Sequence, residues 1–109
     1  MAYDAQLLAR IRTLVAERDG FVEKAMFGGV AFLLNGNMCC GVHRDDLIGR
    51  LDRADGERAL DEEHVRPFDL TGRPMKGWLL VGPAGVESDE DLSWWVDRAS
   101  EFAGSLAPK

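Results

Sequence analysis

Four residues of the chain have side chains that commonly bind soft metals or act as nucleophiles: Cys39, Cys40, His43 and His64. A structural zinc site needs four ligands around one ion, usually from paired C-x₂₋₄-C motifs. Neighbouring cysteines on a regular strand point to opposite faces, so these two are not expected to share an ion. A Cys39 nucleophile with His43 as its base would still lack an orienting acid and an oxyanion hole. We therefore expect buried, reduced thiols, and no catalytic residue, metal or cofactor.

A loop with two cations offers a better candidate for binding. Thr71–Gly77 reads Thr-Gly-Arg-Pro-Met-Lys-Gly, and loops on a rigid scaffold often carry binding residues. Arg73 and Lys76 supply the charges, Pro74 stiffens the segment, and Met75 adds an adaptable apolar side chain. We interpret Arg73, Met75 and Lys76 as candidate binding residues. The alternative is that Arg73 pairs with nearby carboxylates while Met75 fills the edge of the core.

Four further positions complete the candidate binding set. Gly28 and Gly29 could offer backbone N–H groups to an anion, although they lack the spacing of a phosphate-binding loop. A kinked strand entry is the structural alternative for this pair. Arg50 is expected on a mixed sheet face that water or a partner can reach. Trp94 lies beside Trp95 but off its helical stripe, which indicates a contact surface.

Hydrophobic periodicity and turn signals predict the elements that hold these residues. A helix is expected to begin at the Asp4 cap and end at Arg18–Gly20, and a longer one to follow the Ser88 cap. A short, weakly amphipathic helix is expected within residues 52–63. The predicted strands are Phe21–Phe27, Val30–Leu34, Asn37–His43, Asp46–Leu51, Val65–Leu70 and Trp78–Val81. These elements indicate one α+β two-layer domain over residues 1–109, a mostly antiparallel sheet flanked by N- and C-terminal helices.

The Asn35-Gly36 dipeptide predicts a two-residue hairpin turn, because a type I′ turn needs positive φ at both positions. The predicted pairs across it are Leu33–Met38, Phe32–Cys39 and Ala31–Cys40. In this register Met38 and Cys40 would face the helices. The opposite face would carry Cys39, His43, Ile48 and Arg50.

Composition restricts the class of partner. The formal net charge is −6, from 13 Lys and Arg against 19 Asp and Glu, so we do not expect direct nucleic-acid binding. The N-terminus lacks a secretory pattern, and no apolar run approaches the roughly 20 residues of a membrane span. We expect a cytoplasmic domain with a protein partner, or a homodimer that forms through a sheet edge or the Trp94 surface.

Several short motifs together resemble the TfoX N-terminal domain family. They are Met26-Phe27-Gly28-Gly29, Asn35-Gly36-Asn37-Met38, Asp46-Leu47, Arg50, Pro67-Phe68-Asp69 and Thr71–Gly77. The similarity runs from about Met26 to Val81. It implies a two-layer fold of order α-β(3)-α-β(2)-α. The named members are regulators of bacterial competence that act with the cyclic-AMP receptor protein and carry a second, C-terminal helical domain, whereas this chain ends at Lys109.

The leading hypothesis is a stand-alone, non-enzymatic interaction and regulatory domain that acts through protein contacts, in transcriptional or competence regulation. The alternative is a domain that binds a small molecule or an anion. That site would use the loops at Gly28-Gly29 and Thr71–Gly77, together with Arg50.

Overall fold

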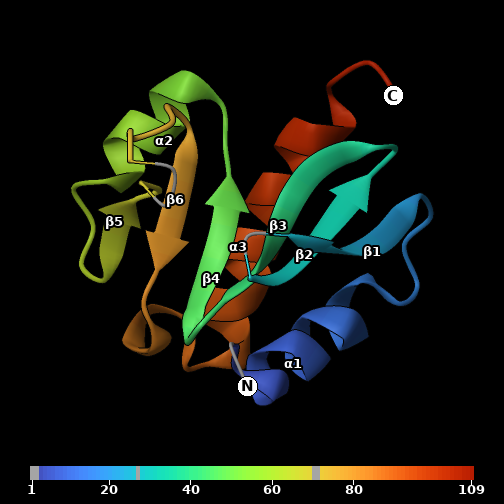
Figure 1. Cartoon of the computed structure of the whole chain (residues 1–109), viewed down its shortest axis with the longest axis horizontal. Helices are drawn as coiled ribbons and strands as arrows, with labels where there is room; N and C mark the ends of the chain where they lie inside the picture. Colours follow the sequence, from blue (N-terminus) through green and yellow to red (C-terminus); the bar gives the residue numbers. More distant parts are fainter. Residues whose placement is uncertain (1–2, 27, 70–71) are drawn as a thin grey trace.

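The computed structural model describes residues 3–26, 28–69 and 72–109. In chain order the elements are α1 (Ala5–Val15), β1 (Phe21–Met26), β2 (Gly29–Leu34), β3 (Asn37–His43), β4 (Asp46–Arg50), α2 (Arg53–Ala59), β5 (Val65–Pro67), β6 (Trp78–Val81), the 3-10 turn η1 (Pro83–Val86) and α3 (Asp89–Gly104). The strands form one antiparallel sheet of order β1-β2-β3-β4-β6-β5 (Figure 1). No helix in the described ranges is long and apolar enough to cross a membrane.

The predicted α+β class is confirmed. Four strands precede α2, one more than the family order implies, because the chain after the Arg44-Asp45 turn forms a separate strand, β4. The predictions that concern Phe27, Leu70 and Thr71 lie outside the described residues.

The two long helices begin where the sequence supplies capping side chains. The Asp4 carboxylate accepts two backbone N–H groups of the first turn of α1, and Ser88 Oγ accepts the N–H of Asp91 at 3.0 Å. Each bond satisfies a backbone donor that the helix itself leaves unpaired. α1 ends at Val15, earlier than the predicted end at Arg18–Gly20.

Both helices pack on the same face of the sheet, and α3 crosses behind the strands in Figure 1. Their apolar stripes and the facing strand residues form the larger core. Its buried members include Leu8, Ile11, Phe32, Cys39, Cys40, Val42, Leu47, Leu79, Val81, Leu92, Trp95 and Val96. Since Ala59 of α2 also belongs to this core, all three helices are fixed through one apolar layer.

The β2–β3 hairpin contains a bulge at Cys39, which corrects the predicted register. The observed pairs are Leu33–Met38, Phe32–Cys40 and Ala31–Gly41. The first pair is the predicted one. The predicted partners of Phe32 and Ala31 were wrong by one residue, because a bulge sets two residues of one strand against one of its neighbour.

The bulge also changes which side chains share a face. Cys39 and Cys40 both lie in the core under the helices, and Cys39 Sγ is 3.6 Å from Ser100 Oγ of α3. Met38 lies instead in the smaller apolar cluster with Ile48. The prediction that Met38 faces the helices and Cys39 faces away was therefore wrong, since regular alternation does not continue through a bulge.

Candidate protein-binding face

The sheet face opposite α1 and α3 carries side chains that line up across the strands. The register sets Val22 of β1 opposite Leu33 of β2, and Leu33 opposite Met38 of β3. Arg50 of β4 donates from its guanidinium to the Met38 carbonyl at 3.4 Å and lies opposite Trp78 of β6. We call these five residues, four of them apolar and one a cation, the apolar row.

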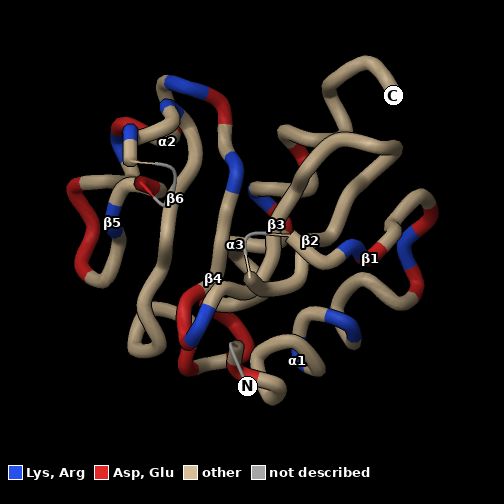
Figure 2. Tube along the Cα trace, in the orientation of Figure 1, with Lys and Arg blue, Asp and Glu red and all other residues tan. Residues whose placement is uncertain are grey.

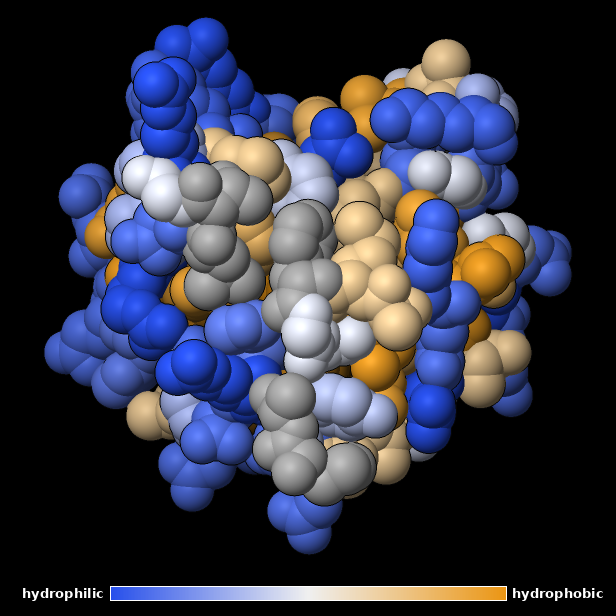
Figure 3. All heavy atoms as spheres, in the orientation of Figure 1, coloured by the Kyte–Doolittle hydropathy of each residue, from blue (hydrophilic) through white to orange (hydrophobic). Residues whose placement is uncertain are grey.

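The apolar row is accessible at one end and buried at its centre. Val22 is 63% exposed, whereas Met38 is 6% exposed. Leu33, Arg50 and Trp78 are half-buried. Figure 3 shows a strip of hydrophobic residues to the right of the centre of this face, with hydrophilic residues beside it. A partly exposed apolar strip of this kind is typical of a surface that contacts another protein.

The cation of the row is held between two aromatic rings. The guanidinium carbon of Arg50 is 5.2 Å from the centre of the Trp78 ring and 5.4 Å from that of Phe102 on α3. The paired part of β3 and β4 ends at Cys40–Gly49, so Arg50 lies beyond the ladder and can contact α3. Cation–π attraction therefore fixes a positive charge beside apolar side chains.

A second row lies two residues further along each strand, or three along β3 because of the bulge, and has a cation at each end. It consists of Lys24, Ala31, Gly41, Ile48, Leu80 and Arg66. Lys24 is exposed, and Arg66 donates to the Asp46 carboxylate at 2.7 Å. Phe68 and Met75 pack against the apolar middle of the row. The face is thus apolar at its centre, with the charge of the exposed Lys24 at one end and the Arg66–Asp46 ion pair at the other.

The loop that was predicted to bind packs against this face. Phe68 donates its backbone N–H to the Trp78 carbonyl at 3.2 Å, and Met75 donates to the Phe68 carbonyl at 3.2 Å. Met75 is half-buried in the cluster around Phe68. This placement agrees with the alternative in which Met75 fills the edge of the core.

The two cations of the same loop are exposed. Lys76 Nζ lies 3.8 Å from a carboxylate oxygen of Glu57 on α2. The two side chains are 59% and 60% exposed, so water screens this ion pair. A role for Arg73 and Lys76 in binding stays a prediction.

Gly28 and Gly29 lie at the other end of β3 from Arg50. A Cβ on Gly29 would come 1.9 Å from the Val42 carbonyl oxygen, whereas one on the exposed Gly28 would meet nothing within 4 Å. The first observation supports the strand-entry alternative, since two backbones approach closely at Gly29. Gly29 contacts β3 at Val42, and Arg50 contacts β3 at Met38. These two positions are four residues apart, which is roughly 13 Å along a strand. The glycine pair and Arg50 therefore do not form a single site.

Trp94 is separate from this face, because it lies on α3. It is 44% exposed and Trp95 is 6% exposed, which confirms that only Trp95 belongs to the buried stripe. The predicted binding residues therefore lie in three separate places: on the sheet face, at Gly28-Gly29, and on the helical side of the molecule.

Sequence reasoning named Arg50 but missed the residues around it. The alternation of β1 could have identified Val22, because on a regular strand Val22 and Lys24 share one face and Glu23 lies on the other. No signal in the sequence indicates the contact between Arg50 and Phe102, since it depends on where the β3–β4 ladder ends.

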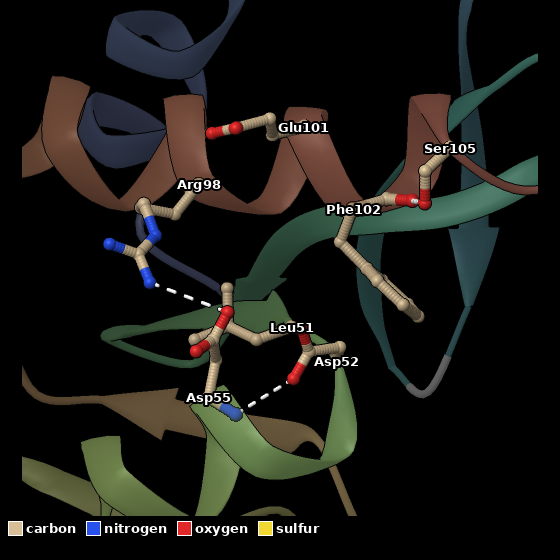
Figure 4. A pocket seen from close by; sticks show the side chains of 7 residues that line it. All are labelled: Leu51, Asp52, Asp55, Arg98, Glu101, Phe102 and Ser105. Carbon is tan, nitrogen blue, oxygen red and sulfur yellow. Dashed lines mark hydrogen bonds and ion pairs between the residues drawn. The ribbon is translucent and has the colours of Figure 1, made fainter.

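A cavity of about 280 Å³ lies next to Arg50, because Phe102, whose ring Arg50 contacts, forms part of its lining. It lies between α2 and α3 and is lined by Leu51, Asp52, Asp55, Arg98, Glu101, Phe102 and Ser105 (Figure 4). Arg98 reaches from α3 to within 3.5 Å of an Asp55 carboxylate oxygen. Asp52 accepts the N–H of Asp55 at 2.8 Å, and this bond lowers the pKa of Asp52. Because these carboxylates already cap and join helices, we interpret the cavity as a helix junction.

The two thiols are free and buried, as expected. The reason given for excluding a shared ion was wrong, since the bulge sets both thiols on one side. A hydrogen bond between them lowers the pKa of Cys39, and the same bond together with burial raises the pKa of Cys40. Within the described ranges, no three His, Cys, Asp or Glu residues are arranged to hold a metal ion.

Comparison with known proteins supports the resemblance found in the motifs. The family model described as TfoX N-terminal domain matches residues 13–103. This range contains all six strands, and therefore both rows of the sheet face. Neither the curated proteins nor the solved structures contain a match.

Proposed function

The chain belongs to the TfoX N-terminal domain family, a family of regulatory domains, and on this premise we propose that it is a non-enzymatic interaction domain. It acts in the cytoplasm, in transcriptional or competence regulation, by binding a protein partner. The observation that supports this function is the apolar row, whose exposed end at Val22 leads to a cation fixed at Arg50.

The chemistry of the face defines the partner. Apolar side chains at the centre favour an apolar anchor on the partner, because burying that area removes it from water. The cations at Lys24 and Arg50 favour carboxylates around that anchor. The partner is therefore a protein segment that combines apolar side chains with acidic ones. A second copy of this chain is one such protein, since its net charge is −6.

Affinity capture with matched variants tests this function. Val22→Glu adds a negative charge to the exposed end of the row, at a position whose 63% exposure keeps the cost in stability small. Leu60→Glu makes a similar change at another exposed apolar residue, which is 39% exposed. We expect the wild-type chain and Leu60→Glu to retain a common partner from a cell extract, and Val22→Glu to lose it.

A double variant tests the loop. Arg73→Glu/Lys76→Glu reverses both cations of the segment that packs beside Met75, and weaker capture of the same partner is expected. Sizing chromatography of each purified variant shows whether that partner is a second copy. Identical partner lists for the wild type, Val22→Glu and the double variant would refute binding through this face.

A further inference from the structure

A second cavity, of about 430 Å³, lies beside Trp94 on the helical side of the molecule. Three segments line it, namely the α2–β5 loop, η1 and the first half of α3. The lining residues are Glu62, Glu63, His64, Gly85, Asp91, Trp94 and Trp95. We call this cavity the Trp94 groove. None of these residues belongs to the apolar row or the row beside it.

One wall of the Trp94 groove is aromatic and partly exposed. The rings of Trp94 and Trp95 meet edge to face, with their centres 4.8 Å apart and their planes at 88°. Trp95 is buried in the core, so it holds Trp94 in place while 44% of Trp94 stays exposed. The Arg98 guanidinium carbon lies 5.1 Å from the centre of the Trp94 ring. The ring therefore already attracts a cation from its own helix.

The remaining wall is acidic. Figure 2 shows acidic residues in the loop before β5. Asp91, in the first turn of α3, lines the same cavity as Glu62 and Glu63. Among the residues that the structure describes, neither Glu62 nor Asp91 forms an ion pair. Glu63 lies 3.5 Å from His64, with 92% of its side chain exposed. The groove thus combines an aromatic surface with two carboxylates, those of Glu62 and Asp91, to which the described part of the chain supplies no ion-pair partner.

We propose that the Trp94 groove binds a lysine- or arginine-bearing segment of a protein partner. The stem of such a side chain covers the indole, while its charged end meets the carboxylates of Glu62 and Asp91. Anionic segments are repelled by the same carboxylates, and purely apolar segments leave them desolvated and unpaired. This inference goes beyond the function proposed above, since it concerns another side of the molecule and a partner of opposite charge.

An NMR titration with a defined basic peptide tests the groove directly. Tetralysine amide is the probe, and tetra(Nε-acetyllysine) amide is its uncharged control. The chain has three tryptophans, and each gives a separate indole N–H signal. We expect tetralysine to shift the signals of Trp94 and Trp95 and to leave that of Trp78 unchanged. The acetylated peptide should shift none of them.

Substitutions separate a specific site from attraction by net charge. Trp94→Leu removes the ring and should weaken tetralysine binding about 2- to 30-fold, as expected for a cation–π contact of about 0.5–2 kcal/mol. Glu62→Gln/Asp91→Asn removes two charges from the groove and should weaken binding by a similar factor. Glu17→Gln/Asp19→Asn removes two exposed charges elsewhere and should change it less than twofold. Circular dichroism verifies that each variant is folded.

Three results would overturn the proposal. The first is equal weakening by the two charge-removing variants, which would indicate attraction to the net charge alone. The second is an equal affinity for the acetylated peptide, and the third is a shift of the Trp78 signal in place of that of Trp94. None of these results bears on the apolar row, whose variants and partner are measured separately.

Discussion

Arg50 and Trp78 lie opposite each other on β4 and β6, and the guanidinium carbon of Arg50 is 5.2 Å from the centre of the indole ring. The same guanidinium is 5.4 Å from the Phe102 ring. One side chain therefore contacts both the open sheet face and the helix that covers the opposite face. A residue that first suggested ligand binding also joins the two layers of the domain.

Replacement of Arg50 should reduce stability. Arg50→Ala removes two cation–π contacts and the packing of the side-chain stem, which together should lower the free energy of unfolding by about 1–2 kcal/mol. Arg50→Lys should keep part of this stabilisation, because an ammonium group retains the charge but cannot stack as a planar guanidinium does. Urea denaturation followed by tryptophan fluorescence measures both variants.

Lys24→Ala is the control for Arg50, since Lys24 is an exposed cation on the same face. Its effect should stay within about 0.5 kcal/mol. Equal losses for Lys24→Ala and Arg50→Ala would contradict a role for the two rings.

The sequence predicts the hairpin and not the bulge beside it, for a physical reason. A turn is local, and Asn35 and Gly36 have φ of 53° and 86°, as the dipeptide indicates. The bulge at Cys39 depends on contacts between strands and with α3, including the approach of Cys39 to Ser100. No local propensity of a Cys-Cys dipeptide encodes those contacts.

In the candidate site, too, local features can be predicted from the sequence and contacts between distant segments cannot. Alternation in the predicted strands is enough to put Arg50 on an open, mixed face. Its contacts with Trp78 and Phe102 depend on which strands are neighbours and on where one ladder ends. These are properties of the assembled sheet, so a sequence read segment by segment does not contain them.

Gly29 should be intolerant of a side chain for a steric reason. A Cβ there would lie 1.9 Å from the Val42 carbonyl oxygen, and β2 would have to move away from β3. Gly29→Ala should therefore cost about 1–3 kcal/mol, the usual range for overpacking. Thermal and urea denaturation measure the loss.

Gly49 provides the matched control, because it is also a buried glycine in a strand but has nothing within 4 Å of its ideal Cβ. Gly49→Ala should be neutral, or should stabilise by about 0.4–1 kcal/mol through the unfolded chain. A similar cost at both positions would show that the Val42 carbonyl is not the cause.

The thiols should be unreactive in the folded protein. Cys39 and Cys40 are each 0% exposed, and the raised pKa of Cys40 further reduces its thiolate fraction. Ellman's reagent at pH 8 should therefore label neither thiol quickly in buffer and both in urea. Ala84→Cys, at an exposed position of η1, supplies the control rate. One thiol of the wild type reacting at that rate would contradict the burial.

The ion pair between α1 and β1 should make stability depend on pH in the acidic range. Arg12 donates to both carboxylate oxygens of Glu23, at 2.5 and 2.9 Å, and this hydrogen bonding lowers the pKa of Glu23. A carboxyl group whose pKa is lower in the folded state stabilises the fold above its unfolded pKa of about 4.3. That contribution is lost as the pH falls through the folded pKa.

Glu23→Gln should consequently be less stable than the wild type at pH 7, by at most about 1 kcal/mol because the pair is partly exposed. The difference should shrink below pH 4 and disappear when Glu23 is protonated in both states. Urea titrations at a series of pH values from 7 to 2.5 measure it. Glu17→Gln, which removes an exposed carboxyl of the same region, is the control. A difference for Glu23→Gln that stays constant down to pH 2.5 would mean that packing, and not charge, joins α1 to β1.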